Sequence, residues 1–178
     1  DGKFIATDLL GATYNAVPSQ IWAAEFWFNA AASSAQYISE SQNPGGDNDP
    51  SMIYGFESDG GVPKLEFYRG NGRAGGPLAT GQWHYVVVAF YGNNSGHFDN
   101  LREIYFNGAL AVSDTTTSFS TAHALGAFSI GAPVSGTGNR FTGRVDEYAI
   151  YDLGSYADLS ARQQFVSGLA QHHQLAIP

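Results

Sequence analysis

The stretch Phe141-Thr-Gly-Arg-Val-Asp-Glu-Tyr-Ala-Ile-Tyr-Asp-Leu153 decides the fold of this chain. Its residues have the pattern of a long strand. A short helix follows, because Ser160-Ala-Arg-Gln163 matches the pattern of a capping box. The sequence predicts this helix over about residues 161–167, with Gly168 as its stop.

Other strands are expected upstream, separated by polar loops at about 43–50, 70–77 and 92–101. Residues 83–91 are apolar on both faces, as in a central strand, and Trp83 is expected in the core with Trp22. Asn107-Gly108 predicts a type I′ hairpin turn. Residues 19–28 read as a strand with two different faces, a core face with Trp22, Ala24, Phe26 and Phe28 and a more polar face with Glu25, Trp27 and Asn29.

Three ordered motifs carry a family resemblance. Gly81-Gln-Trp83-His84 opens the central strand, Asn107-Gly108 closes a hairpin, and Gly143 to Tyr151 contains the late Asp146-Glu147 pair followed by Leu159-Ser160. In this order they resemble the laminin-G-like, concanavalin A-like lectin domains, over about residues 19–168. The resemblance implies an all-β fold: a two-sheet antiparallel jelly-roll sandwich with one short C-terminal helix. Residues 1–178 are expected to form one such domain.

Composition excludes several classes of partner. The chain has 8 Lys and Arg against 16 Asp and Glu, a formal net charge of −8, so nucleic acid is not an expected partner. Neutral sugars or cation-bridged ligands suit such a surface better than polyanionic glycans. No apolar run is long enough to span a membrane. Cysteine is absent, which is compatible with a secreted bacterial domain but does not establish one.

Enzyme chemistry is not expected. Glucanases of the concanavalin A-like fold carry two catalytic carboxylates on one strand, as Glu-x-Asp-x-Glu or Glu-x-Asp-x-x-Glu. Neither pattern occurs in this sequence. Asp146 and Glu147 are adjacent on a predicted strand, so they should point to opposite faces and form no pair. Asp146 is expected on the face of Tyr148 and Ile150, where its carboxylate would accept backbone hydrogen bonds or, alternatively, bind a ligand.

Calcium is the metal that the polar loops favour, because their side chains supply oxygen ligands. Two candidate clusters contain Asp47 with Asp49, and Asn93 with Asp99. Neither has the spacing of an EF-hand loop. Asp and Asn are also ordinary turn residues, so a purely structural role stays open for each cluster.

Sugar binding calls for exposed aromatic rings beside amide and carboxylate groups. One candidate set is Trp27 with Glu25 and Asn29, and Tyr37 and Tyr54 are further aromatic candidates. The alternative is that these rings pack beneath loops, as aromatic residues of sandwiches commonly do. The second set lies at the end of one strand and in the loop after it, and consists of Tyr68, Arg69, Asn71 and Arg73.

The leading hypothesis is a non-catalytic, lectin-like carbohydrate-binding module of a secreted or cell-surface bacterial protein, acting as one module of a larger chain. Its ligand would lie at a loop rim or on the concave sheet, with one calcium ion as the candidate cofactor. The runner-up is a protein-interaction or adhesion module of the same fold without a sugar site. A glycan hydrolase or lyase comes third. Fold alone does not choose among them.

Overall fold

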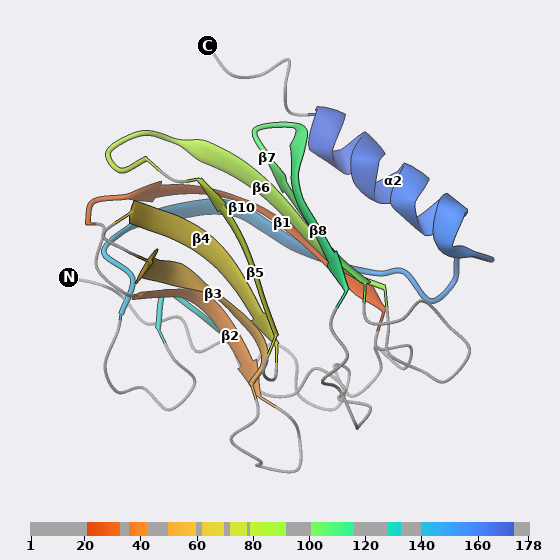
Figure 1. The fold of residues 1–178 in the computed structure, drawn as a ribbon, viewed down its shortest axis with the longest axis horizontal. Helices are drawn as coiled ribbons and strands as arrows, with labels where there is room; N and C mark the ends of the chain where they lie inside the picture. Colours follow the sequence, from red (N-terminus) through yellow and green to blue (C-terminus); the bar gives the residue numbers. More distant parts are fainter. Residues whose placement is uncertain are drawn as a thin grey trace.

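A computed structural model describes residues 21–32, 36–42, 50–59, 62–69, 72–77, 79–91, 101–115, 128–132 and 140–172 (Figure 1). Most of this part is strand, and one helix follows the last strand. The elements are β1 (Trp22–Ala30), β2 (Gln36–Gln42), β3 (Pro50–Asp59), β4 (Val62–Arg69), β5 (Gly72–Pro77), β6 (His84–Phe90), β7 (Leu101–Phe106), β8 (Ala109–Thr115), β9 (Phe128–Ile130), β10 (Gly143–Asp152) and α2 (Leu159–His172).

The strands form two five-stranded antiparallel sheets that face each other. One sheet has the order β10-β1-β6-β7-β8 and the other has the order β5-β4-β3-β2-β9. Neighbours such as β1 and β10 are far apart in the chain, which is the crossing connectivity of a jelly roll. The all-β sandwich predicted from the sequence is therefore confirmed.

The core lies between the two sheets. Trp22, Phe26 and Phe28 of β1 are fully buried in it, as the alternation predicted. From the facing sheet, Ile38 and Leu65 are equally buried. The ring of Tyr148 on β10 stacks on Phe26 at 5.2 Å, and its hydroxyl donates to Ser39 Oγ at 3.1 Å, which ties β10 to β2 across the sandwich.

A second apolar cluster lies on the outer face of β1 and β6, beneath α2. Val166 and Ala170 of the helix are fully buried against Ala23, Val87 and Ala89 of the sheet. Figure 1 shows α2 lying along this sheet, on the side away from β2 to β5. The face of β1 that the sequence described as more polar is thus largely an interface with the helix.

The helix differs from its prediction at both ends. It begins at Leu159, and Asp158 caps it, because Asp158 Oδ1 accepts a hydrogen bond from Ala161 N at 2.8 Å. The predicted cap at Ser160 is therefore wrong. Gly168 does not stop the helix, which continues to His172, since packing on the sheet outweighs the lower helix propensity of one glycine.

Two further predictions are wrong. Residues 72–77 form the edge strand β5, although residues 70–77 read as a loop, because an edge strand can pair through its backbone alone and three of the six residues are glycine. Trp83 is 41% exposed and so lies outside the core, because β6 begins only at His84.

A bulge interrupts the pairing of β10 with β1. Glu25 lies opposite Ala149 but Trp27 lies opposite Asp146, so one residue of β1 faces two residues of β10. Glu147 occupies this bulge with φ of 50°. The bulge moves Asp146 to the face opposite Tyr148, where it is exposed and accepts a hydrogen bond from Glu147 N at 2.9 Å. The expected sharing of a face between Asp146 and Tyr148 is therefore wrong.

Within the described ranges, α2 does not have the length and apolar character that crossing a lipid bilayer requires.

Candidate functional site

Glu25, from the first candidate set, lies beneath α2. It is 9% exposed, and the hydroxyls of Tyr85 and Tyr151 both donate to its carboxylate. Burial, followed by the hydrogen bond to Glu25, raises the pKa of Tyr151 to about 12, and the same two causes raise the pKa of Tyr85. The Tyr85 hydroxyl also lies 3.1 Å from the carbonyl oxygen of Leu169 on α2. The carboxylate therefore joins β1 to β6 and β10, and the Tyr85 hydroxyl makes the contact with the helix.

Trp27 and Asn29, the other members of that set, lie on the same face of β1. The Trp27 ring is partly buried and packs against Tyr85, with 5.2 Å between ring centroids. Asn29 is half-buried, opposite Arg144 of β10. The set therefore lies at the border of the α2 interface, where much of the Trp27 ring is used in packing.

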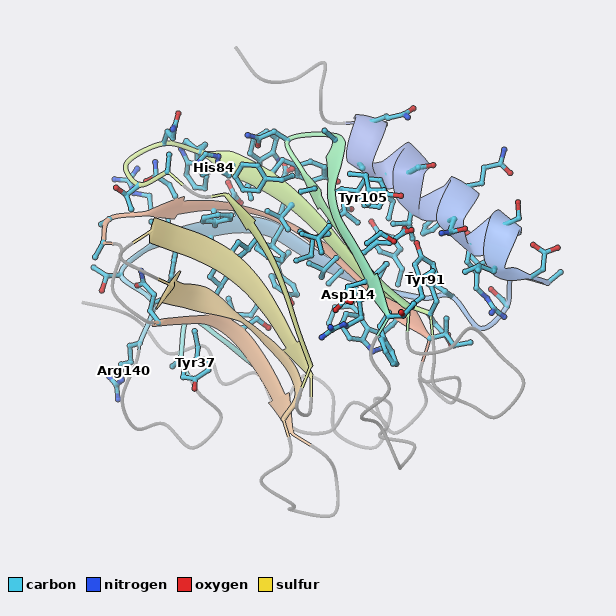
Figure 2. All side chains as sticks on the ribbon, in the orientation of Figure 1. Tyr37, His84, Tyr91, Tyr105, Asp114 and Arg140 are labelled. Carbon is cyan, nitrogen blue, oxygen red and sulfur yellow. The ribbon has the colours of Figure 1, made fainter. Side chains whose placement is uncertain are left out.

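A matching carboxylate, Glu103 of β7, was not predicted. It is 3% exposed and accepts hydrogen bonds from Tyr91 at 2.8 Å, Tyr105 at 3.1 Å and Gln163 Nε2 of α2 at 2.7 Å. Figure 2 shows Tyr91 and Tyr105 between the sheet and the helix. Burial raises the pKa of both tyrosines. No local sequence signal marks Glu103, because two of its three partners, Tyr91 and Gln163, come from other segments of the chain.

Arg102, next to Glu103, points to the opposite face. It is fully buried and forms an ion pair with Asp114, its partner across the β7–β8 ladder. Burial lowers the pKa of Arg102, and the bond to Asp114 opposes that effect. The pair joins β7 to the edge strand β8 and is separate from both candidate sets.

His84 and Asn107 bring two sequence motifs together. His84 Nε2 lies 2.8 Å from the carbonyl oxygen of Ala79, and its Nδ1 lies 3.3 Å from Asn107 Nδ2. Asn107 Oδ1 also accepts a hydrogen bond from Tyr85 N at 3.0 Å. Asn107 and Gly108 have φ of 48° and 85°, which confirms the predicted turn with positive φ at both centres. Burial lowers the pKa of His84.

The second candidate set belongs to the other sheet. Tyr68 of β4 lies directly opposite Arg73 of β5, and Arg69 lies opposite Gly72. Position 68 is three residues from the buried Leu65, so alternation assigns it to the outer face of its sheet. Asn71 lies outside the described residues. The two candidate sets are on different sheets, so they do not form one site.

The outer face of this sheet is not covered by α2, which packs on the other sheet (Figure 1). Cross-strand partners share a face, so the ladders define rows across it. In one row Arg73 lies opposite Tyr68, Tyr68 opposite Ile53 and Ile53 opposite Glu40. In a second row Tyr37 lies opposite Gly55 and Gly55 opposite Glu66.

Arg140, which the sequence did not single out, continues the second row. It forms an isolated parallel bridge with Tyr37 of β2. The side chain of Arg140 is exposed and that of Tyr37 is half-buried. The residues are 103 positions apart in the chain (140 − 37), so no sequence motif could have paired them.

The predicted calcium ligands Asp47, Asp49, Asn93 and Asp99 all lie outside the described residues. Within the part of the chain that is described, no group of three or more His, Cys, Asp or Glu side chains gathers as a metal site would require.

Comparison with known proteins identifies the family and the fold. A family model for the concanavalin A-like lectin/glucanases superfamily, Laminin_G_3, matches residues 6–154. No curated protein matches the chain by sequence. Among solved structures, a heptameric SAP-like pentraxin from Limulus polyphemus is 15% identical with a TM-score of 0.62, over 88% of this chain and 70% of the pentraxin.

Two carbohydrate-binding relatives have the same fold. The CBM40 module of the Ruminococcus gnavus IT-sialidase has a TM-score of 0.60 at 12% identity, over 94% of this chain and 90% of that one, and has also been solved with α2,3-sialyllactose. Domain 4 of the Geobacillus stearothermophilus arabinanase AbnA, solved with arabinotriose, has a TM-score of 0.52 at 19% identity, over 86% and 68%. Identities this low bear on the fold alone. With the family match over most of its length, the chain belongs to the Laminin_G_3 family of the concanavalin A-like lectin/glucanases superfamily.

Proposed function

We propose that this domain is a non-catalytic carbohydrate-binding module that binds its glycan on the outer face of the sheet β5-β4-β3-β2-β9. The observation that carries the proposal is the asymmetry of the sandwich. Helix α2 covers the outer face of one sheet, whereas the other outer face has tyrosine, arginine and glutamate positions aligned across its strands.

The composition of these rows suits sugar recognition. Aromatic rings stack on the apolar faces of pyranoses, and charged or amide groups read the hydroxyls around them. Tyr68 and Arg73, both members of the second candidate set, occupy one row together. Arg69 and Asn71 would contribute from the adjoining end of β4 and the loop after it.

The structural relatives support the same proposal. The similar CBM40 module is described with sialyllactose bound, and the similar arabinanase domain with arabinotriose. These ligands belong to those proteins, but they indicate that this sandwich can present sugar-binding surfaces. The non-catalytic part of the proposal depends on the missing carboxylate motif in the sequence.

We further propose that the domain, with a core over about residues 19–168, acts outside the cell as one module of a larger protein. Calcium, if bound, would use the oxygen side chains of the two polar loops, with Asp47 and Asp49 in one and Asn93 and Asp99 in the other. These residues lie in other segments of the chain than Tyr68 and Arg73, so calcium binding is proposed separately from glycan binding on the sheet.

A paired mutation experiment tests the proposed face. The wild-type domain is screened on a glycan array, and the best neutral ligand is then titrated against Tyr68→Ala and Trp83→Ala. Loss of one stacking ring should weaken binding by about tenfold in Tyr68→Ala and leave Trp83→Ala unchanged. Equal affinity of Tyr68→Ala and wild type, with an unchanged melting temperature, would exclude this face.

A second candidate function, protein interaction, has its own supporting observation. Trp83 is 41% exposed and Leu110 is 50% exposed, and the bond between His84 and Asn107 brings their two segments close together. Exposed large apolar residues that gather on one surface commonly mark interaction sites. A domain that binds no glycan on the array, but loses a protein partner in Trp83→Ala, would favour this function.

A further inference from the structure

The bridge between Tyr37 and Arg140 joins an aromatic ring and a guanidinium at one edge of the proposed sugar-binding face. Figure 2 shows both side chains extending away from the sandwich on the same side of the molecule. Cross-strand bridges hold such side chains about 5 Å apart at their roots. Two groups with complementary uses in sugar recognition therefore stand side by side.

The backbone beneath Arg140 is firmly held. The next residue, Phe141, is 8% exposed, with its ring centroid 6.5 Å from that of Phe28 in the core. Phe141 N donates to the carbonyl oxygen of Gly131 at 2.9 Å, and Thr142 N donates to Gln36 Oε1 at 2.6 Å. Because Phe141 points inward, Arg140 points outward, and the two hydrogen bonds hold the backbone directly after it.

The orientation of Tyr37 likewise follows from the burial of its two neighbours. Its neighbours Gln36 and Ile38 are 3% and 0% exposed, and Gln36 Nε2 donates to the carbonyl oxygen of Ala32 at 2.6 Å. Both neighbours are anchored inside, so the Tyr37 ring takes the outer face. Its partner across the next ladder is Gly55, which has no side chain to cover the ring.

We propose that Arg140 and Tyr37 form a subsite for a carboxylated sugar, a uronic or sialic acid, with the guanidinium binding the carboxylate and the ring stacking on the sugar. A guanidinium offers two parallel N–H donors that match a carboxylate, and such charge-assisted bonds are stronger than neutral ones. The subsite deepens the proposed function and depends on it, since it belongs to the same sheet face.

The net charge of −8 does not oppose such a subsite at close range. Charges separated by more than about 8 Å are largely screened at physiological salt, whereas a guanidinium and a carboxylate in contact are not. The overall negative field would instead slow the approach of an acidic glycan. Specificity for a carboxylate is then set locally by Arg140.

The test uses α2,3-sialyllactose with two matched neutral ligands, its methyl ester and lactose. Trigalacturonic acid is the uronic acid probe. The wild-type domain should bind one of the two acids at least about tenfold more tightly than the corresponding neutral sugar, because the charged hydrogen bond is lost in the ester. Which acid shows the preference distinguishes a sialic from a uronic acid site.

Variants assign the preference to residues. Arg140→Gln should remove the tenfold preference and leave binding of the neutral sugar unchanged, and Arg140→Lys should retain only part of it because the fork is lost. Tyr37→Ala should weaken acid and neutral ligands alike, whereas Tyr37→Phe should not. Arg144→Gln is the matched control, since Arg144 is an exposed arginine on β10 of the other sheet and its loss changes the charge equally.

The outcomes separate this inference from the proposed function. Binding of neutral glycans without any preference for the acids, or a preference that survives in Arg140→Gln, overturns the subsite and leaves the carbohydrate-binding function standing. Failure of all acidic and neutral glycans to bind the folded wild type overturns the proposed function, and the subsite with it.

Discussion

At the scale of single residues, His84 is the most informative side chain. It lies 4% exposed between Phe28 and Phe106, at ring distances of 5.4 and 4.7 Å. With Nε2 donating to Ala79, Nδ1 is left to accept from Asn107, so the neutral ring satisfies both nitrogens. The sequence identified both motifs but not their contact, which exists only after the hairpin folds back beside β6.

The titration of His84 should appear in the stability of the domain. Burial lowers its pKa from the ordinary value of 6.5, so the unfolded chain takes up the proton first as the pH falls. The free energy of unfolding should therefore be constant above about pH 7.5 and should decrease as the pH falls through 6.5. Urea titrations between pH 5 and 8 measure this slope.

His84→Gln supplies the control for that experiment. It should be less stable than wild type at pH 8 but lose less stability between pH 7.5 and pH 5.5. An identical slope in both proteins would mean that His84 does not carry the effect.

Glu147 is a second residue whose backbone sets its role. Its φ of 50° lies in the left-handed region, which glycine adopts freely and β-branched residues avoid. Glu147→Gly should therefore be more stable than Glu147→Val by about 1–2 kcal/mol. Thermal melts of the two variants measure the difference, and equal melting temperatures would show that the bulge does not require this conformation.

At the scale of elements, β10 shows how far the sequence could be interpreted. The residue pattern predicted the strand, and Tyr148 and Ile150 do pack against the core. The bulge was not predictable, because it depends on the register between β10 and β1, and a local pattern carries no register. The same limit explains β5, which pairs through its backbone and has almost no side-chain pattern.

Gly143 of β10 and Gly168 of α2 should respond in opposite ways to substitution by alanine. A Cβ at Gly143 would lie 2.1 Å from the carbonyl oxygen of Asn29 and 2.9 Å from the Phe141 ring, whereas a Cβ at Gly168 meets nothing within 4 Å. Gly143→Ala should destabilise the domain by about 1–3 kcal/mol or more, as overpacking does. Gly168→Ala, inside α2, should stabilise it by up to about 1 kcal/mol.

Urea unfolding of both variants provides the measurement, and each serves as the reference for the other. A tolerated Gly143→Ala would show that β1 and β10 can separate at their ends, contrary to the close approach in the structure.

At the scale of the whole molecule, the sequence predicted the architecture but only part of the candidate site. It located Tyr68 and Arg73, which the fold pairs, because both lie in one short segment. It did not find Arg140, because the partner of Arg140 comes from the other end of the chain. It chose Trp27 and Glu25 as exposed, because nothing in their strand reveals that α2 packs over them.

Removal of calcium should change the thermal stability of the whole domain. If calcium binds the native loops, as we propose, 5 mM EDTA should lower the melting temperature, and added calcium should restore it. A ligand specific to the native state stabilises that state, by about 2.7 kcal/mol when its concentration is 100 times its Kd. Asp99→Asn should reduce the response to EDTA. A melting temperature that EDTA leaves unchanged would remove calcium from the proposal.

The bulge at Glu147 has a consequence for how copies of this domain behave in concentrated solution. In the described part of the chain, β10 is the outermost strand of its sheet. A straight outer strand offers a regular series of free amide and carbonyl groups, which is a template for aggregation. The backbone at Glu147 breaks that regularity midway and adds a local twist. The bulge therefore hinders a strand of another molecule from pairing with β10 and extending the sheet.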